Sequence, residues 1–207
     1  MTPYNRIAFI GNSLPRRCGI ATFTTDLQLA IAASRPDMET VIVAMTDHGH
    51  VYDYPPSVGF QINDGVLQDY IDAAQYLNAG KFDVVSLQHE FGIFGGEAGG
   101  HIMALLSRLS MPVVTTLHTI LSEPTPVQRS VLTSIANASL KVVVMSEKGR
   151  ELLRLVYQVP DEKIEIIPHG IPDFAFVEPA EAKDKLGFSE NAVILTFGLL
   201  SPNKGIE

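Results

Sequence analysis

The chain has 207 residues and a formal net charge of −8 at pH 7. This charge argues against a nucleic-acid-binding protein, because such proteins present basic surfaces to phosphates, and it argues against binding to anionic membranes for the same reason. The apolar fraction of 46% is sufficient for a packed core. No apolar run approaches the roughly 20 residues that a membrane span needs.

Two features indicate the compartment. The single cysteine excludes an internal disulfide bond, which fits a reducing environment. Residues 1–6 lack the basic region followed by an apolar stretch that marks a signal peptide. We therefore expect a cytoplasmic protein.

Short apolar runs alternate with amphipathic stretches of helical length. In chain order we expect a strand at Ile7–Ile10, a helix at Ala21–Ala33, strands at Thr40–Met45 and Phe60–Ile62, a helix at Val66–Asn78, a strand at Asp83–Gln88, a helix at Ala98–Leu109, a strand at Val113–Leu117, a helix at Pro126–Ala138, a strand at Lys141–Met145, a helix from the N-cap Ser146 to about Tyr157, and a strand at Lys163–Ile167. In the first helix, the residues expected to face the core are Phe23, Leu27, Ala30 and Ile31.

The strands are continuous Val/Ile runs, which is typical of strands buried on both faces of a sheet. Their alternation with helices predicts right-handed crossovers and a parallel sheet. We therefore predict an α/β fold, a doubly wound and mainly parallel Rossmann-like domain, over residues 1–170.

Residues 171–190 are rich in Pro, Asp, Glu and Lys and are interpreted as a linker. In residues 191–207 we expect a buried strand at Ala192–Phe197, a loop at Gly198–Lys204 and the first turn of a helix at the last three residues. Because a new strand-loop-helix unit opens there, we expect the sequence to be the front part of a longer protein.

Polar residues follow the predicted strands. The segments are Gly11–Gly19, His89-Glu90 with the glycines after it, His118-Thr119, Ser146-Glu147 and Pro168-His169-Gly170. Ligands of open parallel sheets bind beyond the carboxyl ends of the strands. The sequence therefore predicts a binding site at this edge of the sheet.

The segment Gly11–Gly19 contains Arg16 and Arg17 and leads into a helix. The N-terminus of a helix offers unpaired N–H groups and partial positive charge, so this loop could hold a phosphate; the alternative is a solvated turn. Neither the Gly-x-Gly-x-x-Gly dinucleotide pattern nor a P-loop pattern is present, which argues against a dinucleotide site and a P-loop kinase or ATPase.

The loop after the fourth expected strand is rich in glycine. It contains Gly92, Gly95, Gly96, Gly99 and Gly100. Such a loop is expected to be flexible and to close over a substrate; the alternative is a long surface connection. Glu90 could accept hydrogen bonds from sugar hydroxyls or act as a base, and its alternative is a capping or salt-bridged carboxylate.

His118 follows an otherwise apolar strand. Its imidazole could donate a hydrogen bond to a sugar hydroxyl or a phosphate oxygen, or it could be a structural group. His48 and His50 are too few ligands for a metal site. Cys18 has no evident base partner, so we expect it to pack and not to act as a nucleophile.

These segments together resemble the retaining glycosyltransferases of the GT-B fold in family 4. The five motifs that carry the resemblance are residues 15–23, Gln88-His89-Glu90-Phe91-Gly92, Thr116-Leu117-His118-Thr119, residues 166–171 and residues 197–205. The resemblance implies two Rossmann-like domains that face a cleft. This chain would hold the N-terminal domain, which mainly binds the acceptor, and the start of the domain that binds the donor.

The resemblance also implies roles for individual residues. Gly19 and its neighbours would approach the donor diphosphate, His118 would lie near the transferred sugar, and Lys204 would contact the diphosphate. The sequence departs from many relatives in having Leu199 in place of an arginine and Cys18 in place of a glycine. His169 stands where relatives often have an asparagine.

The implied reaction transfers a sugar, mannose or glucose, from a nucleotide-sugar donor to a sugar or lipid-linked acceptor with retention of configuration. It needs no cofactor and no obligatory metal, and the isolated 207 residues are expected to be nearly inactive. We expect His118 and Glu90 to be catalytic. The residues expected to bind substrate are Arg17, Gly19, His89, Gly92, Thr119, His169, Gly170 and Lys204.

Two alternatives remain. A phosphorylase or a sugar-nucleotide epimerase would use the same two-domain fold for other chemistry. A non-catalytic sugar-binding module would bind without turnover.

Overall fold

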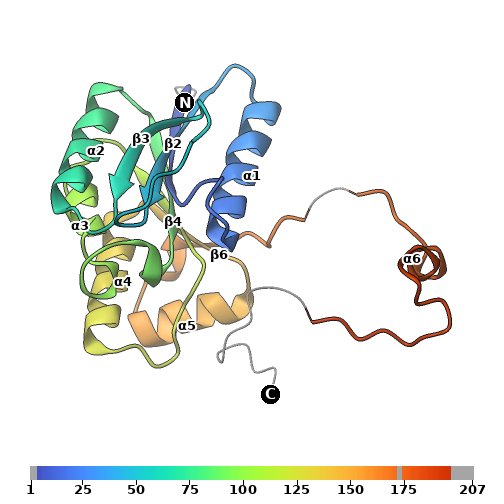
Figure 1. The fold of residues 1–207 in the computed structure, drawn as a ribbon. Coiled ribbons are helices and arrows are strands. Elements are labelled where there is room, and N and C mark those ends of the chain that lie inside the picture. Colours follow the sequence, from blue (N-terminus) through green and yellow to red (C-terminus); the bar gives the residue numbers. More distant parts are fainter. Residues whose placement is uncertain (1–3, 172–173, 197–207) are drawn as a thin grey trace. The chain divides into compact units, whose positions relative to one another are not determined.

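A computed structural model describes residues 4–171 and 174–196. The described residues form a seven-stranded sheet in the order β3-β2-β1-β4-β5-β6-β7. Every neighbouring pair of strands is parallel. Helices cover the sheet (Figure 1). The predicted α/β, Rossmann-like class is confirmed.

The elements follow the expected order. The strands are β1 (Arg6–Gly11), β2 (Glu39–Thr46), β3 (Val58–Asn63), β4 (Val84–His89), β5 (Val113–Leu117), β6 (Lys141–Val144) and β7 (Ile164–Ile166). The α-helices are α1 (Gly19–Ser34), α2 (Leu67–Ala79), α3 (Ile102–Leu106), α4 (Pro126–Ala138), α5 (Glu147–Tyr157) and α6 (Pro179–Leu186), and the short 3-10 helices are η1 (Phe91–Ile93), η2 (Glu97–Gly99) and η3 (Asp161–Lys163).

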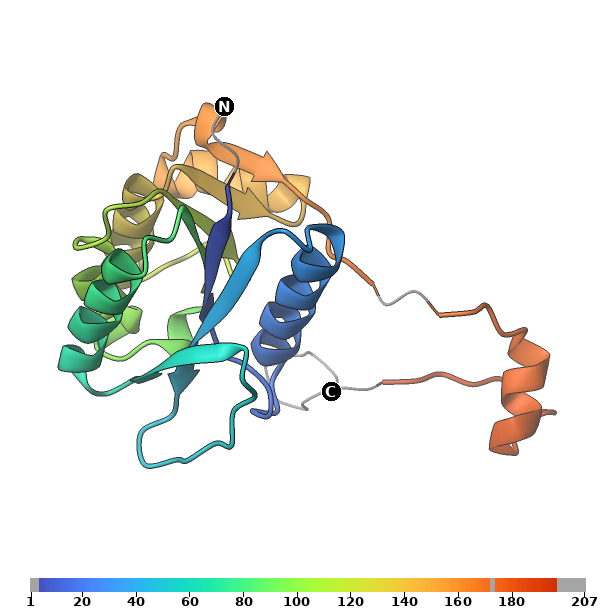
Figure 2. The ribbon, with the colours of Figure 1, turned by 90° about the horizontal axis from the view of Figure 1, so that it is seen from above.

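The core lies on both faces of the sheet because successive strand residues point to opposite faces. In β1, Ala8 and Ile10 pack with α2 and α3, whereas Phe9 packs with α1. The helix α4 contributes to the core beside α3 and to the cluster that it shares with α5. Figures 1 and 2 show α1 on one side of the sheet and α2, α3 and α4 on the other.

The helix starts have identifiable caps. The Ser146 hydroxyl accepts a hydrogen bond from the Gly149 amide at 3.2 Å, as its predicted role as N-cap of α5 requires. Thr125 and Gln128 form a capping box at α4, with Pro126 as the first helical residue. These signals explain why the start of α4 can be predicted from the sequence.

The expected core face of α1 is partly wrong. Leu27 and Ile31 are partly buried against β1 and β2, but Ala30 is exposed. Thr24 and Gln28 are buried instead. They are tolerated because each has a hydrogen-bond partner: Thr24 donates to the Ile20 carbonyl at 2.8 Å and Gln28 to Thr40 at 2.7 Å.

Two further expectations need correction. The helix expected at Ala98–Leu109 shortens to α3 because Ala98 (φ 51°) and Gly99 (φ 77°) leave the helical conformation. The segment interpreted as a linker contains the helix α6, and its role as a linker stays a prediction. Residues 192–196 are exposed and form no strand in the described part of the chain, where no neighbouring strand supplies hydrogen bonds, and Phe197 lies outside the described residues.

The chain divides into two compact units, residues 1–169 and 170–207. The first contains the whole sheet and the second contains α6. Among the described residues, no helix has the length and apolarity needed to cross a membrane.

The glycine-rich loop after β4 is packed onto the turn after β3. The Gly95 amide donates a hydrogen bond to the Tyr70 hydroxyl at 2.9 Å, and that hydroxyl donates to the Asp64 carbonyl at 2.9 Å. A Cβ atom on Gly95 would lie 1.8 Å from the same carbonyl oxygen. This glycine therefore serves a close backbone approach and not mobility.

Replacing Gly95 by alanine should destabilise the domain. The methyl group would force the backbone of Asp64 away, and overpacking of this kind costs about 1–3 kcal/mol. Gly92→Ala is the matched control, because a Cβ there meets no atom within 4 Å. Urea unfolding of both variants checks the prediction, and equal losses would contradict it.

Candidate functional site

The carboxyl ends of β1 and β4 lie side by side at the point where the strand order reverses. Ile10 of β1 pairs with Leu87 of β4, and β1 pairs with β2 on its other side. The connections after β1 and β4 therefore lead in opposite directions, and in open α/β sheets ligands bind at such a point. The predicted site residues that follow β1, β4 and β5 meet at this edge.

His118 is held at the end of β5 by three contacts. Its amide donates to the His89 carbonyl at 3.0 Å. Its Nε2 lies 3.1 Å from Gln88 Oε1, and its imidazole packs in a T-shaped arrangement with the Phe23 ring of α1, with 4.7 Å between ring centroids. Gln88 is fixed in turn, because its Nε2 donates to the Ser86 hydroxyl at 3.0 Å.

These hydrogen bonds assign the tautomer of His118. A carbonyl oxygen only accepts, so with Gln88 Oε1 facing it Nε2 carries the proton and Nδ1 keeps a lone pair. Burial, together with a smaller effect of the nearby His169, lowers the pKa of His118 to about 4. The ring is therefore neutral at pH 7, and Nδ1 is an acceptor for a ligand hydroxyl.

His89, predicted to bind substrate, is fully buried at the end of β4. Its ring lies against Phe91 and Phe94, and neither ring nitrogen has a hydrogen-bond partner in the described part of the chain. Burial lowers the pKa of His89 to about 4. No surface of this ring is open to a ligand, so its role in binding stays a prediction.

Glu90 and Thr119 are brought together from the ends of β4 and β5. The Thr119 hydroxyl donates a hydrogen bond to a Glu90 carboxylate oxygen. Both side chains are partly exposed, and Thr119 directly follows His118. The carboxylate therefore lies on the same edge as the imidazole, with its second oxygen available as an acceptor.

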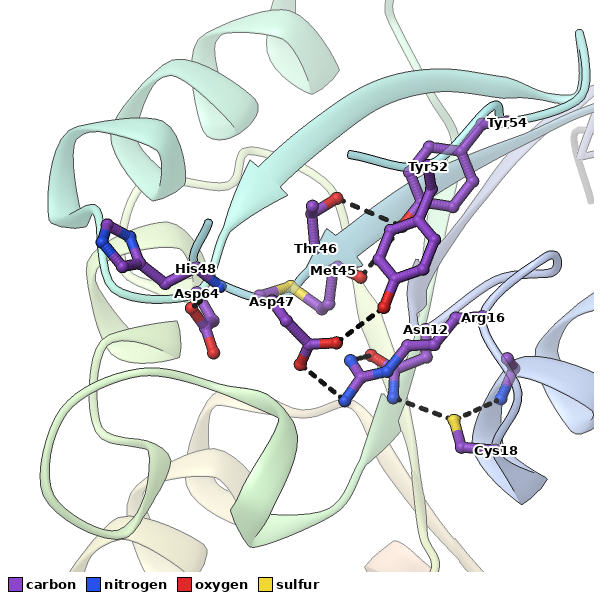
Figure 3. Close-up of polar contacts among 11 residues, drawn as sticks. Asn12, Arg16, Cys18, Met45, Thr46, Asp47, His48, Tyr52, Tyr54 and Asp64 are labelled. Atoms are coloured by element: carbon purple, nitrogen blue, oxygen red, sulfur yellow. Dashed lines mark hydrogen bonds and ion pairs between the residues drawn. The ribbon is translucent and has the colours of Figure 1, made fainter. Parts of the chain in front are cut away.

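The two arginines after β1 differ in their contacts. Arg16 forms an ion pair with Asp47 and a hydrogen bond with Asn12, both at 2.7 Å (Figure 3). Arg17 is exposed and has no ion pair or hydrogen bond with any described residue. Beside it, α1 begins at Gly19, where a Cβ would meet nothing within 4 Å. A ligand could therefore approach the helix amides and Arg17 together.

A pocket of about 210 Å³ opens beside His118 at the N-terminus of α5. Its lining residues are Leu117, His118, Ile120, Met145, Ser146, Lys148, Gly149 and Leu152. Ser146 was predicted at this edge, whereas Lys148 was not. Lys148 is the second residue of α5, and no sequence motif marks it as a site residue. Gln88 as the partner of His118 was missed as well.

The remaining predicted residues are less closely grouped. His169 is exposed, and its ring edge meets Phe23 with 5.2 Å between centroids, so Phe23 lies against both His118 and His169. Gly92 and Gly170 are exposed. Lys204 lies outside the described residues. Within the described ranges, no three His, Cys, Asp or Glu side chains are grouped in a way that could hold a metal ion.

Folding should become less favourable at acidic pH because of His89. Its pKa falls from 6.5 to about 4 on burial, so between these values the unfolded chain binds more protons. The contribution of the neutral His89 ring to the free energy of unfolding is complete above pH 6.5 and is lost as the pH falls towards 4. At about 1.36 kcal/mol per pKa unit it amounts to roughly 3 kcal/mol.

The measurement is the free energy of unfolding between pH 7 and pH 4. The fall for wild type should exceed that for His89→Phe by about this amount, whereas the control His50→Gln, at an exposed loop histidine, should follow wild type. Parallel profiles for wild type and His89→Phe would refute the prediction.

Known proteins support the fold and the family. No curated protein matches the chain in sequence. A crystal structure of a glycosyltransferase from Rickettsia africae ESF-5 matches 92% of this chain at 14% identity with a TM-score of 0.59. The match covers 51% of that protein, so the chain spans about half of its length. This likeness shows the fold alone.

A weaker likeness is to an alpha-glucosyltransferase in complex with UDP and a 13-mer DNA containing a central A:G mismatch. It covers 72% of this chain and 39% of that protein, at 13% identity and a TM-score of 0.48. Residues 19–173 match the family Glycosyltransferase Family 4. This match spans well over half of the chain, and the protein therefore belongs to Glycosyltransferase Family 4.

Proposed function

We propose that this chain is the acceptor-side domain of a retaining, metal-independent glycosyltransferase that uses a nucleotide-sugar donor. The observation that carries the proposal is the neutral imidazole of His118, whose Nδ1 lone pair lies at the same sheet edge as Glu90 and near the start of α1. Membership of a glycosyltransferase family supports the transferase chemistry. The transferred sugar is proposed to be mannose or glucose, from the family resemblance.

His118 binds the transferred sugar in this proposal. Its Nε2 is occupied by Gln88, so Nδ1 accepts a hydrogen bond from a sugar hydroxyl. The low pKa keeps the ring neutral, and an imidazolium would lose this acceptor. His118 thus positions the sugar over the site, and positioning of a reacting group is itself a large part of catalysis.

Glu90 is the second catalytic residue that we propose. Its carboxylate is oriented by Thr119 and accepts a hydrogen bond or a proton from a hydroxyl of the acceptor. We assign no protein nucleophile. Gly92, His169 and Gly170 are exposed and remain proposed contacts of substrate, as does Lys204.

Departure of a nucleoside diphosphate needs positive charge at the leaving oxygens. Arg17 and the free amides at the start of α1 provide it from this domain. A donor-binding domain that completes the cleft is part of the proposal, and the isolated 207 residues are proposed to be nearly inactive. We place the enzyme in the cytoplasm, where nucleotide sugars are available.

The enzyme encoded by the complete reading frame that contains residues 1–207 should release a nucleoside diphosphate from a sugar nucleotide in the presence of an acceptor. A panel of GDP- and UDP-linked sugars tests this. Activity in the presence of EDTA tests metal independence, and the anomeric configuration of the product tests retention. Phosphate-dependent cleavage without a nucleotide sugar would favour a phosphorylase, interconversion of the sugar nucleotide an epimerase, and saturable binding without turnover a binding module.

His118→Ala should lower kcat/KM by roughly 100-fold or more, because it removes an oriented acceptor in the site. His48→Ala is the control, since His48 is an exposed histidine in the connection after β2. Steady-state assays with the preferred donor make the comparison. A His118→Ala enzyme with unchanged kcat/KM would remove His118 from the mechanism.

A further inference from the structure

The loop after β1 is connected to the end of β2 by one charged side chain. Arg16 reaches across with both terminal nitrogens (Figure 3). Nη2 lies 2.7 Å from Asp47 Oδ1, and Nη1 donates to Asn12 Oδ1 at 2.7 Å. Asp47 directly follows β2, and Asn12 directly follows β1, so the guanidinium bridges neighbouring strands at the candidate site.

The connection continues from Asn12 to the first turn of α1. Asn12 Nδ2 donates to Cys18 Sγ at 3.2 Å, and the same sulfur accepts the Ala21 amide at 3.4 Å as the N-cap of α1. We call Asp47, Arg16, Asn12 and Cys18 the Asp47 relay. It is a continuous series of polar contacts from the end of β2 to the amide end of α1.

Asp47 is itself held by a further hydrogen bond, and the side chains of Asn12 and Arg16 are largely buried. The second oxygen of Asp47 accepts a hydrogen bond from the Tyr52 hydroxyl at 2.9 Å, so both carboxylate oxygens are used. Asn12 is 1% exposed, and the Arg16 side chain is 19% exposed. A charge pair that is partly withdrawn from water is held more firmly than an exposed pair.

The relay also determines which charges face a ligand. Asp47 offsets the charge of Arg16, and one contact on each terminal nitrogen holds the guanidinium toward Asp47 and Asn12. Arg17 and the amides at the start of α1 remain. The geometry therefore separates a positioning arginine from a neighbouring arginine that can contact a ligand.

We propose that Asp47 is a positioning residue that holds the amide end of α1, through Arg16, Asn12 and Cys18, in the orientation that binds the diphosphate of the donor. The ligand chemistry rests on the proposed function, whereas the relay itself is a statement about the loop. A sulfur atom is a weak hydrogen-bond acceptor. The cap of α1 therefore depends on the support that Asn12 and Arg16 give it from outside the helix.

The first test measures the order of the loop after β1 by the reactivity of the Cys18 thiol and needs no activity assay. Cys18 is the single cysteine of the 207 residues, so a small thiol reagent reports on it alone. Asp47→Asn keeps the shape of the side chain but removes the ion pair, and the thiol should react roughly threefold to tenfold faster. Asp53→Asn is the matched control, because Asp53 is exposed in the same loop and has no partner among the described residues.

The second test uses the enzyme encoded by the complete reading frame. In Asp47→Asn, the KM for the sugar nucleotide should rise roughly threefold to tenfold while the KM for the acceptor stays within error of wild type. Asp47→Glu retains the charge and should restore most of the donor affinity. A merely structural loss would raise both KM values together and would not separate the two substrates.

The two tests together distinguish failure of the Asp47 relay from failure of the proposed function. Wild-type labelling of Cys18 in Asp47→Asn would overturn the relay. Faster labelling together with a lower donor KM would also overturn the proposal, because it would mean that the released Arg16 binds the donor better than the positioned loop does. Faster labelling in a protein that turns over no sugar nucleotide would support the relay and refute the proposed function.

Discussion

The reversal of strand order between β1 and β4 is the constraint on which the site depends. All strands of the described sheet are parallel, so every carboxyl end lies on one edge, and the reversal opens that edge at its middle. The backbone topology alone is sufficient to place at this edge the loop after β1, the Gln88–His118 pair and the Glu90–Thr119 pair. Their contacts then refine an arrangement that the sheet has already imposed.

Desolvation explains why two histidines at this edge are neutral. Burial disfavours the charged form of an imidazole, and neither His89 nor His118 is paired with a carboxylate in residues 4–171 or 174–196. For His118 the consequence is chemical, since Gln88 occupies one nitrogen and the other remains an acceptor. For His89 the consequence is energetic, because the ring lies against Phe91 and Phe94 and neither of its nitrogens has a hydrogen-bond partner among the described residues.

The sequence was informative where the signal is local. The bounds of β5 and α4 could be predicted without error because an apolar run and a capping box each lie within a few residues. The core face of α1 was partly wrong because Thr24 and Gln28 are buried through hydrogen bonds that periodicity does not record. The edge of the sheet and the histidine at its centre were predictable, whereas the partners Gln88 and Asp47 were not, since their pairing depends on tertiary distance.

The neighbouring arginines Arg16 and Arg17 show how a tertiary contact gives two similar residues different roles. In the sequence Arg16 and Arg17 are equivalent candidates for a phosphate contact, and Arg17 is among the residues predicted to bind substrate. Asp47, which follows a different strand, engages Arg16 and leaves Arg17 exposed. The site that we propose for the donor diphosphate therefore offers the exposed guanidinium of Arg17 beside a helix start that is held in place. In this proposal, affinity for the donor depends on the order of that loop as much as on its charge, because a preorganised group loses less entropy on binding.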